Sequence, residues 1–353
     1  MIEKTREFLI NQIQKYPYME IQDLLKFLYQ SAFGCEHLVS SMEGAIFSVK
    51  QEIGANPSFK SMELEPLDGA YCRVPLSLIN EGLSAETLGK LFFFSAKKEA
   101  DGKEALVNKL NILEQLIMEK KLPFSIETFK KEKKNWEENG YKAIHHSDRY
   151  RENYHPSYRL IAKDYLPFLP FFREIDRRLE RGNVTVAIEG GSAGGKTTLS
   201  KLLKRLYDCT VFSMDDFFLQ SHQRTTERYE EIGGNIDWER FLEEVLLPLK
   251  SRQRITYRKL DCTTMTLSEA VSVVPGKLCV IEGAYSMHPK LSSYYDISLF
   301  LEIPFFIQKE RILRRNGEEM AKRFFSEWIP LENIYFEKTN CKERCDFTIL
   351  VDQ

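Results

Sequence analysis

The chain has 353 residues, of which 43% are hydrophobic and 29% charged, and its formal net charge is −2. This length favours two domains over a single core, and the near-neutral charge excludes the strongly basic surface on which general nucleic-acid binding depends. Charged residues interrupt the apolar positions of residues 1–18 and no apolar run approaches the ~18 residues of a membrane span, so we expect a cytoplasmic protein without a signal peptide or a membrane partner.

The first 165 residues carry the periodicity of α-helices. Apolar side chains recur every three or four positions in residues 21–28, 88–92 and 106–117. Ser84 is placed to cap the second of these stretches, and residues 125–139 have a charged helical pattern that ends at Gly140. We therefore predict a mainly α-helical accessory domain over residues 1–165.

This first half offers few residues with recognisable chemistry. Residue types that commonly bind metals occur at Cys35, His37, His145 and His146. Their spacing lacks the paired intervals of structural zinc sites, so we expect polar and core residues of a helical domain. The aromatic and cationic segment 145–159 could bind an anion or a nucleic-acid strand, although acidic residues dilute it. The seven scattered cysteines are expected to be reduced thiols.

A change of pattern follows at residues 166–170, where two prolines interrupt an apolar run. Residues 171–181 then predict a connecting helix that Gly182 closes. We expect a linker or connecting helix over residues 166–182 and a second domain over residues 183–353.

The second domain alternates strands with helices. Short apolar runs predict strands at residues 184–188, 210–214, 278–281, 297–303 and 347–351. Helical patterns lie between them, at residues 199–206, 237–250, 304–315 and 318–328. This alternation is typical of a doubly wound, mostly parallel α/β sheet. The ligand site of such a sheet lies at the carboxyl ends of its strands.

The first of these strands leads into a complete G-x-x-x-x-G-K-[ST] phosphate loop. Its residues are Gly190, Gly191, Ser192, Ala193, Gly194, Gly195, Lys196, Thr197 and Thr198. Glycines let successive N–H groups curl around phosphate oxygens, and the following helix directs its positive end to the same place. Lys196 would reach the β- and γ-phosphates and Thr197 would hold Mg²⁺. The loop predicts ATP and Mg²⁺ as cofactors, with GTP and a turn that binds nothing as alternatives.

Two carboxylates follow strands near this loop. Asp215 ends the second predicted strand, where it could accept a proton from a substrate hydroxyl or fix Mg²⁺. Glu282 ends the third, where a Walker B acid belongs. Asp215 could instead cap a helix, and Glu282 could be a turn residue. Because the D-x-x-G and N-K-x-D motifs of switch GTPases are absent after the loop, the pattern favours a small-molecule kinase.

Two groups of arginines complete the candidate site. Arg311, Arg314 and Arg315 share one face of a predicted helix. They could close over the nucleotide and neutralise charge on the transferred phosphoryl group, or form a solvated face. Arg224 and Arg228 could contact an acidic or phosphorylated substrate, or lie in a surface loop.

Residues 183–353 resemble the uridine kinase and phosphoribulokinase group, particularly the bacterial uridine kinase-like proteins. The resemblance rests on the segments IEGGSAGGKTTL, FSMDDFF, GGNIDWERFLEEVLLPL, ITYRKLDC and VIEGAYSMHP. The loop alone is common to many families. Its combination with Asp-Asp-Phe-Phe about 19 residues later, and then with Asn-x-Asp at Asn235 and Asp237, is more specific. The resemblance implies a P-loop kinase fold and does not extend to residues 1–165.

The resemblance also implies roles on the substrate side. Asp215 matches the family's catalytic base, and Phe218 replaces the usual tyrosine, so that a hydroxyl is lost. Asp237 matches the acid that holds ribose hydroxyls, and Tyr257 resembles an aromatic residue of the nucleobase pocket. The resemblance also implies that Glu282 lies at this substrate site, in addition to its expected role as a ligand of Mg²⁺.

On the nucleotide side, the arginine helix resembles the family's lid. This resemblance implies that Arg311 and Arg315 act in catalysis with Lys196, and that Arg314 binds ATP. The histidine that reads the pyrimidine in nucleoside kinases is absent from residues 257–263. Because a site without that partner cannot discriminate the base edge in the same way, the identity of the acceptor stays open.

The sequence thus predicts an ATP- and Mg²⁺-dependent kinase that transfers the γ-phosphoryl group to a hydroxyl of a nucleoside, such as uridine or cytidine, or of a similar acceptor. One alternative is a kinase for another alcohol, such as pantothenate, a phosphosugar or a vitamin precursor. The other is a non-catalytic ATP-binding regulatory protein. We expect a small-molecule partner, no nucleic acid, and a first domain that packs near the kinase site or mediates assembly, with a homo-oligomer as an open alternative.

Overall fold

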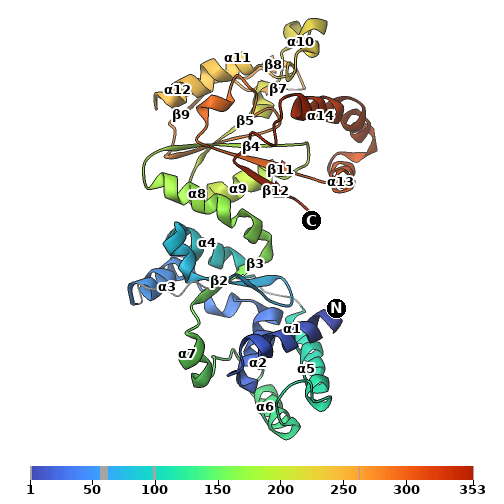
Figure 1. Ribbon diagram of the computed structural model, residues 1–353. Helices are drawn as coiled ribbons and strands as arrows, with labels where there is room; N and C mark the ends of the chain where they lie inside the picture. Colours follow the sequence, from blue (N-terminus) through green and yellow to red (C-terminus); the bar gives the residue numbers. More distant parts are fainter. Residues whose placement is uncertain (1, 56–62, 98–100, 262, 353) are drawn as a thin grey trace. The chain divides into compact units, whose positions relative to one another are not determined.

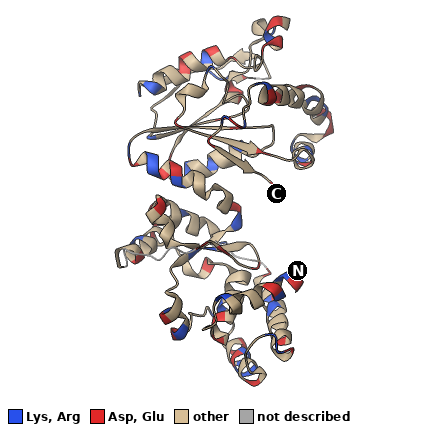
Figure 2. Cartoon of the chain, in the orientation of Figure 1, with Lys and Arg blue, Asp and Glu red and all other residues tan. Residues whose placement is uncertain are grey.

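The computed structural model describes residues 2–55, 63–97, 101–261 and 263–352. These residues divide into two compact units, 1–173 and 174–353, with the division inside helix α8 (Leu169–Leu179). Figure 1 shows both units, and Figure 2 shows that Lys and Arg alternate with Asp and Glu along each. Within the described ranges, no helix has the length and apolar character needed to cross a membrane.

Among the described residues of the first unit, seven α-helices precede α8. They are α1 (Ile2–Lys15), α2 (Ile21–Phe33), α3 (Met42–Ala55), α4 (Ala85–Ser95), α5 (Gly102–Met118), α6 (Ile126–Glu138) and α7 (Asp148–Tyr154). The hydroxyl of Ser84 accepts the N–H of Thr87 and so caps α4 as predicted, and Ser125 caps α6 in the same way. Helix α3 packs on α4, and α2 packs on α5.

The first unit also contains an antiparallel sheet that the sequence analysis did not predict. It consists of β1 (Glu65–Pro66), β2 (Tyr71–Pro75) and β3 (Tyr158–Ala162), in the order β1-β2-β3. Strand β2 is buried along its whole length, so it shows no alternation of apolar and polar residues, and it carries Arg73 at its centre. Its partner β3 lies far away in the sequence, and Arg73 pairs with Leu160.

Arg73 is a charged residue at the centre of this unit, with a side chain only 2% exposed. Its guanidinium pairs with Glu65 at 3.1 Å and donates to Gln30 Oε1 from Nε at 2.9 Å. The guanidinium carbon also lies 3.4 Å from the centroid of the Phe27 ring. Because a buried charge is costly without partners, these contacts explain how an arginine occupies a core strand.

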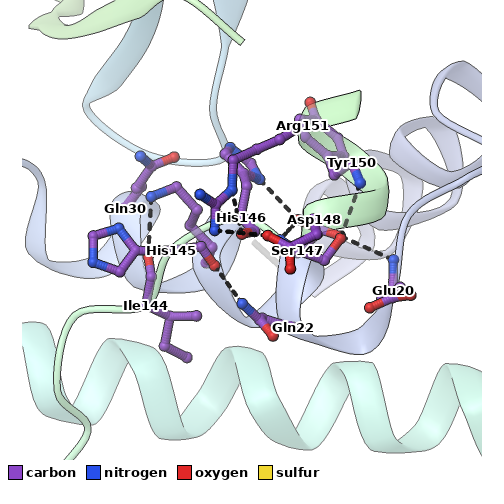
Figure 3. A network of polar contacts seen from close by, with 12 residues as sticks. Glu20, Gln22, Gln30, Ile144, His145, His146, Ser147, Asp148, Tyr150 and Arg151 are labelled. Carbon is purple, nitrogen blue, oxygen red and sulfur yellow. Dashed lines mark hydrogen bonds and ion pairs between the residues drawn. The ribbon is translucent and has the colours of Figure 1, made fainter. Parts of the chain in front are cut away.

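A second chain of hydrogen bonds joins α2 to the segment before α7 (Figure 3). The carboxylate of Asp23 accepts His146 Nδ1 at 2.8 Å and the hydroxyl of Ser147 at 2.6 Å. On the other side of the ring, His146 Nε2 lies 2.8 Å from the hydroxyl of Tyr158. The ring stacks on Tyr150 at 4.1 Å. Burial lowers the pKa of His146 to about 4, against the opposing effect of Asp23, so the imidazole is neutral at pH 7.

This network predicts that the first unit loses stability in mild acid. The unfolded chain protonates His146 below its ordinary pKa of about 6.5, whereas the folded chain resists protonation down to about 4. The stabilising contribution is therefore present above pH 6.5 and is lost as the pH falls toward 4. The contribution to the free energy of unfolding amounts to about 3 kcal/mol.

The measurement is urea unfolding of the full chain at pH 7.0, 5.5 and 4.5, followed by the fluorescence of Trp136 with Trp238 and Trp328 replaced by phenylalanine. His146→Gln should remove most of the pH dependence, whereas His145→Gln, at an exposed neighbour, should retain it. An unfolding free energy of the first unit that is constant between pH 7.0 and 4.5 would show the mechanism to be wrong.

The second unit is built on a five-stranded parallel sheet. Its strands are β4 (Val184–Gly190), β5 (Thr210–Ser213), β10 (Leu278–Glu282), β11 (Ile297–Glu302) and β12 (Phe347–Leu350). They lie in the order β12-β11-β4-β10-β5, and all neighbours are parallel. The five predicted strands are therefore confirmed. Strand β4 is central. After β4 the chain first adds β5 and β10 on one side and then β11 and β12 on the other. A doubly wound sheet binds its ligand at the point where the direction of strand addition reverses.

Helices cover both faces of this sheet (Figure 1). On one face, α9 (Lys196–Tyr207) packs against β4, β5 and β10. On the other face, Phe241 and Val245 belong to a core cluster with Phe212 and Ile281 of the strands. They come from one helical run, α11 (Trp238–Phe241), the π-helical turn η6 (Leu242–Leu246) and α12 (Leu247–Lys250), which corresponds to the helix predicted over residues 237–250.

Small elements link the larger ones. A short turn, η4 (Met214–Phe217), follows β5, and α10 (Thr226–Glu230) lies in the polar stretch after it. Two nested pairs of antiparallel strands follow α12. The outer pair is β6 (Ile255–Tyr257) with β9 (Val271–Val273), and the pair between them is β7 (Leu260–Asp261) with β8 (Thr266–Leu267). The sequence analysis did not predict these strands.

The last helices differ from the prediction at one end. The backbone of α13 (Phe305–Arg323) breaks at Gly317, with φ +73°, in agreement with two predicted segments on either side. The second segment does not end at residue 328. It continues through the π-helical turn η8 (Phe324–Trp328) into α14 (Ile329–Lys338). Pro330 follows the π-helical turn directly and has no N–H to donate within this continuous helical run.

Candidate active site

The phosphate loop leaves the central strand β4 and ends at the start of α9. Gly190 has φ +146°, and a Cβ added there would lie 2.5 Å from the carbonyl oxygen of Leu301 on β11. Gly195, which precedes α9, has φ +94°. Both positions therefore require glycine. Ala193 has φ +58°, a left-handed conformation that a non-glycine residue adopts only at a cost.

Lys196 and Thr197 form the first turn of α9. The ammonium of Lys196 curls back over the loop and donates to the carbonyl oxygens of Gly190 at 2.7 Å and Gly191 at 2.9 Å. The hydroxyl of Thr197 lies 3.3 Å from both carboxylate oxygens of Glu282. The loop lysine, the loop threonine and the acid of β10 thus lie together, although Glu282 is far away in the sequence.

Strand register brings the second carboxylate to the same edge. Glu282 pairs with Ser213, the last residue of β5, and Asp215 follows in the turn η4. Asp215 has solvent access but is closely surrounded by protein atoms, and this desolvation raises its pKa. Lys196 and Arg315 act against the rise, and Asp216 adds to it. Burial also raises the pKa of Glu282, and the charge of Asp215 adds to that effect.

The three arginines of α13 take different positions. Arg311 donates from Nη1 to the carbonyl oxygen of Ala193 at 3.1 Å, so it contacts the phosphate loop directly. Arg315 lies close enough to lower the pKa of Asp215, and its guanidinium is 5.8 Å from the Phe324 ring. Arg314 is exposed. The structure thus brings two of the predicted lid arginines to the loop and to Asp215.

On the predicted acceptor side, Asp237 is buried and already bonded. It caps α11 by accepting the N–H of Arg240 at 3.1 Å, and its other oxygen accepts Gln223 Nε2 at 2.9 Å. The helix cap that the sequence analysis weighed for Asp215 is not observed, because Asp215 lies inside η4 and Ser213 is the capping residue of that turn. Phe218 is partly buried and forms an isolated antiparallel bridge with Ile236.

The ring of Tyr257 belongs to the core. It is 5% exposed and lies 5.8 Å from the ring of Phe217 and 5.7 Å from that of Phe212. Burial raises the pKa of its hydroxyl. Next to it, Lys259 pairs with Asp216 at 2.9 Å, so the second carboxylate of the Asp-Asp pair is bound to a cation.

Sequence reasoning missed several residues that organise this site. Arg240 donates to the carbonyl oxygens of Asp216 at 3.0 Å and Arg258 at 2.6 Å while it contacts Asp237. It joins the segments that carry Asp216, Asp237 and Arg258. Its only signal in the sequence was a position three residues after Asp237, which does not distinguish it from an ordinary surface arginine.

Glu189 was also missed, although it is a lone acid in an apolar strand directly before the loop. It is fully buried and accepts the N–H groups of Tyr285 at 3.0 Å and Met287 at 2.9 Å, and the hydroxyl of Tyr335 at 3.1 Å. Burial raises the pKa of its carboxyl to about 7. It ties the start of the loop to the segment after β10 and to α14.

The remaining candidates have local partners. Arg228 pairs with Glu239 at 2.7 Å and donates to backbone carbonyls of residues 234 and 236. Arg224 donates from Nε to the carbonyl oxygen of Leu219 at 3.1 Å. Cys35 is buried in the first unit. In the part of the chain that the structure describes, no group of three or more His, Cys, Asp or Glu side chains is arranged to hold a metal ion.

Comparisons with known proteins cover about half of the chain. No protein-family model matches it. A uridine kinase of Chlamydia pneumoniae is 25% identical over 177 residues, which are 44% of this chain and 76% of that protein. A structure described as a possible uridine kinase from Bacillus stearothermophilus is 22% identical and covers 50% of this chain and 99% of its own, with a TM-score of 0.37. Shikimate kinase from Aquifex aeolicus is 16% identical over 48% of this chain and 87% of its own, with a TM-score of 0.26.

Proposed function

We propose that the second unit is an ATP- and Mg²⁺-dependent kinase that transfers the γ-phosphoryl group to a hydroxyl of a small molecule. The observation that carries the proposal is the convergence of Lys196, Thr197, Asp215 and Glu282 at the carboxyl edge of three adjacent strands. A loop that only sensed a nucleotide would need Lys196 and Thr197 but no carboxylate like Asp215. The similarity to a uridine kinase supports the same class.

The residues of the loop fit a nucleotide polyphosphate. Positive φ at Gly190 and Gly195 curls the loop backbone, as a cradle of N–H groups for phosphate requires. The ammonium of Lys196 is held over the loop by the carbonyl oxygens of Gly190 and Gly191. Thr197 and Glu282 would hold Mg²⁺, which, when bound, offsets the charge of the phosphates. Arg311 and Arg315 would stabilise the charge that spreads over the transferred group, and Arg314 would contact the nucleotide.

Asp215 would accept the proton of the acceptor hydroxyl. Its raised pKa makes it a better base than an ordinary aspartate. Lys196 and Arg315 act in the opposite direction and limit this rise. Asp216 is paired with Lys259, whereas Asp215 is the exposed carboxylate of the two and has no ion pair with the cations of the described residues.

We propose a nucleoside or a similar polyol as the acceptor, with another alcohol as the alternative. Similarity to a uridine kinase favours the nucleoside. The alternative is favoured by Asp237, whose two oxygens already accept Arg240 and Gln223, and by Tyr257, whose ring packs in the core. A nucleoside would have to share Asp237 with these partners. The first unit remains an accessory domain in this proposal.

The test is ADP release with Mg-ATP, screened over uridine, cytidine, pantothenate and phosphosugars, with Lys196→Ala as the blank. Turnover that depends on uridine or cytidine would support the nucleoside acceptor. Turnover with another alcohol would support the proposed kinase reaction and contradict the proposal of a nucleoside acceptor. Tight ATP binding without acceptor-dependent turnover over a broad alcohol panel would favour the regulatory, non-catalytic reading.

A further inference from the structure

One side of the phosphate loop is bonded to the last two long helices of the chain. The carboxylate of Glu332, on α14, accepts the N–H of Ser192 at 2.9 Å and the hydroxyl of Ser192 at 2.5 Å. On α13, Gln308 donates from Nε2 to the carbonyl oxygen of Ser192 at 2.9 Å. The N–H, C=O and O–H groups of Ser192 are thus each bonded to α13 or α14.

These contacts are buried and are accompanied by apolar packing. Glu332 is 4% exposed and Gln308 is 6% exposed. The next loop residue, Ala193, packs against a cluster that includes Ile312 and Ile329 from the same two helices. Since Ala193 is held at φ +58°, the loop needs support to keep this conformation. The two helices supply that support through hydrogen bonds and packing.

A carboxylate at this place needs a physical reason. The loop presents N–H groups and Lys196 to an anion, and a buried negative charge beside an anion site weakens anion binding. Glu332 offsets this cost only if its bonds improve the geometry of the loop. By accepting both the N–H and the hydroxyl of Ser192, it fixes the peptide between Gly191 and Ser192, and with it the path of the loop that leads into α9.

We propose that Glu332 is a positioning residue of the phosphate loop, and that α14 thereby sets the affinity of the site for Mg-ATP. The inference rests on the proposed function, because it assumes that the loop binds a nucleotide. It assigns Glu332 no contact with the nucleotide. Its effect passes through Ser192.

The experiment compares Glu332→Ala, Glu332→Gln and, as a matched control, Glu337→Ala, which removes an exposed glutamate of the same helix. We measure the Kd of ATP by calorimetry, the KM of Mg-ATP and kcat. Glu332→Ala should raise Kd and KM about tenfold, as expected for loss of a hydrogen bond to a charged group, while kcat changes less than about threefold. Glu332→Gln should keep at least the wild-type affinity, because its neutral amide can accept the N–H of Ser192 and donate to its hydroxyl.

An unchanged Kd in a folded Glu332→Ala chain, with a melting temperature equal to that of Glu337→Ala, would overturn the inference. So would a loss of kcat and stability without a change in Kd. If Glu332→Ala does not fold, Ser192→Ala decides in its place, since a raised Kd supports the inference and an unchanged one opposes it. If the wild-type chain binds ATP but transfers no phosphoryl group, the proposed kinase reaction is contradicted. The inference about Glu332 is still tested in that case, because it depends on the Kd of ATP.

Discussion

Replacing Asp215 by asparagine should lower kcat about 10³-fold and leave the Kd of ATP within about twofold. The amide keeps the size and shape of the side chain but cannot accept the proton of an acceptor hydroxyl, and a positioned base contributes about 10² to 10⁴ in rate. The loop contacts of Lys196 and Thr197 do not depend on Asp215, so nucleotide binding should persist. Acceptor-dependent ADP release and calorimetry with ATP measure the two quantities.

Asp216→Asn is the matched control for this substitution. Asp216 is the adjacent carboxylate, but it pairs with Lys259 at 2.9 Å, so its loss should affect kcat less than about tenfold. In the wild type, kcat/KM should rise with pH through the raised pKa of Asp215, because only the ionised carboxyl acts as a base. An Asp215→Asn enzyme at near wild-type rate would exclude Asp215 as the base.

Replacing Lys196 by alanine should abolish turnover, with a loss of at least about 10³-fold in kcat/KM. The ammonium is the loop's own cation, and transferred phosphoryl groups depend on such charges for stabilisation in the transition state. Because Lys196 also lowers the pKa of Asp215 and Glu282, its removal should leave both carboxyls less ionised. ADP release measures the loss of rate, and the Kd of ATP should rise in parallel.

Lys201→Ala provides the control, since Lys201 lies on the exposed surface of the same helix α9. The folded state of Lys196→Ala can be checked by thermal unfolding, because the side chain bonds the carbonyl oxygens of Gly190 and Gly191 in the loop and its removal should not disturb the sheet. Residual turnover within about tenfold of wild type would contradict a catalytic role for the loop lysine.

The sequence predicted the second unit well because its signals are local. Strands such as β4 and β10 are short apolar runs, and the loop between β4 and α9 has a fixed spacing of glycine, lysine and threonine. The parallel order of the strands then brings Asp215 and Glu282 to one edge without any further information. The positions of these residues followed from the sheet rather than from their own neighbours in the sequence.

The features that were missed depend on contacts between distant segments. Strand β2 is short and buried, and Arg73 within it contradicts the pattern of a core strand until Glu65 and Gln30 are placed beside it. Glu332 has the sequence environment of an ordinary helical glutamate, and only the fold places it on Ser192. Buried polar residues of this kind are recognised by their partners, which a single sequence does not identify.

The central place of β4 has a consequence for the synthesis of the chain. Both neighbours of this strand, β10 and β11, begin at Leu278 and Ile297, close to the end of the chain. A nascent chain that has emerged only as far as α12 therefore carries the phosphate loop on a strand that has no partner on either side. Pairings over such long sequence separations form slowly, and an unpaired apolar strand is a site of aggregation. Newly made chains should therefore depend on chaperones until β10 and β11 have left the ribosome.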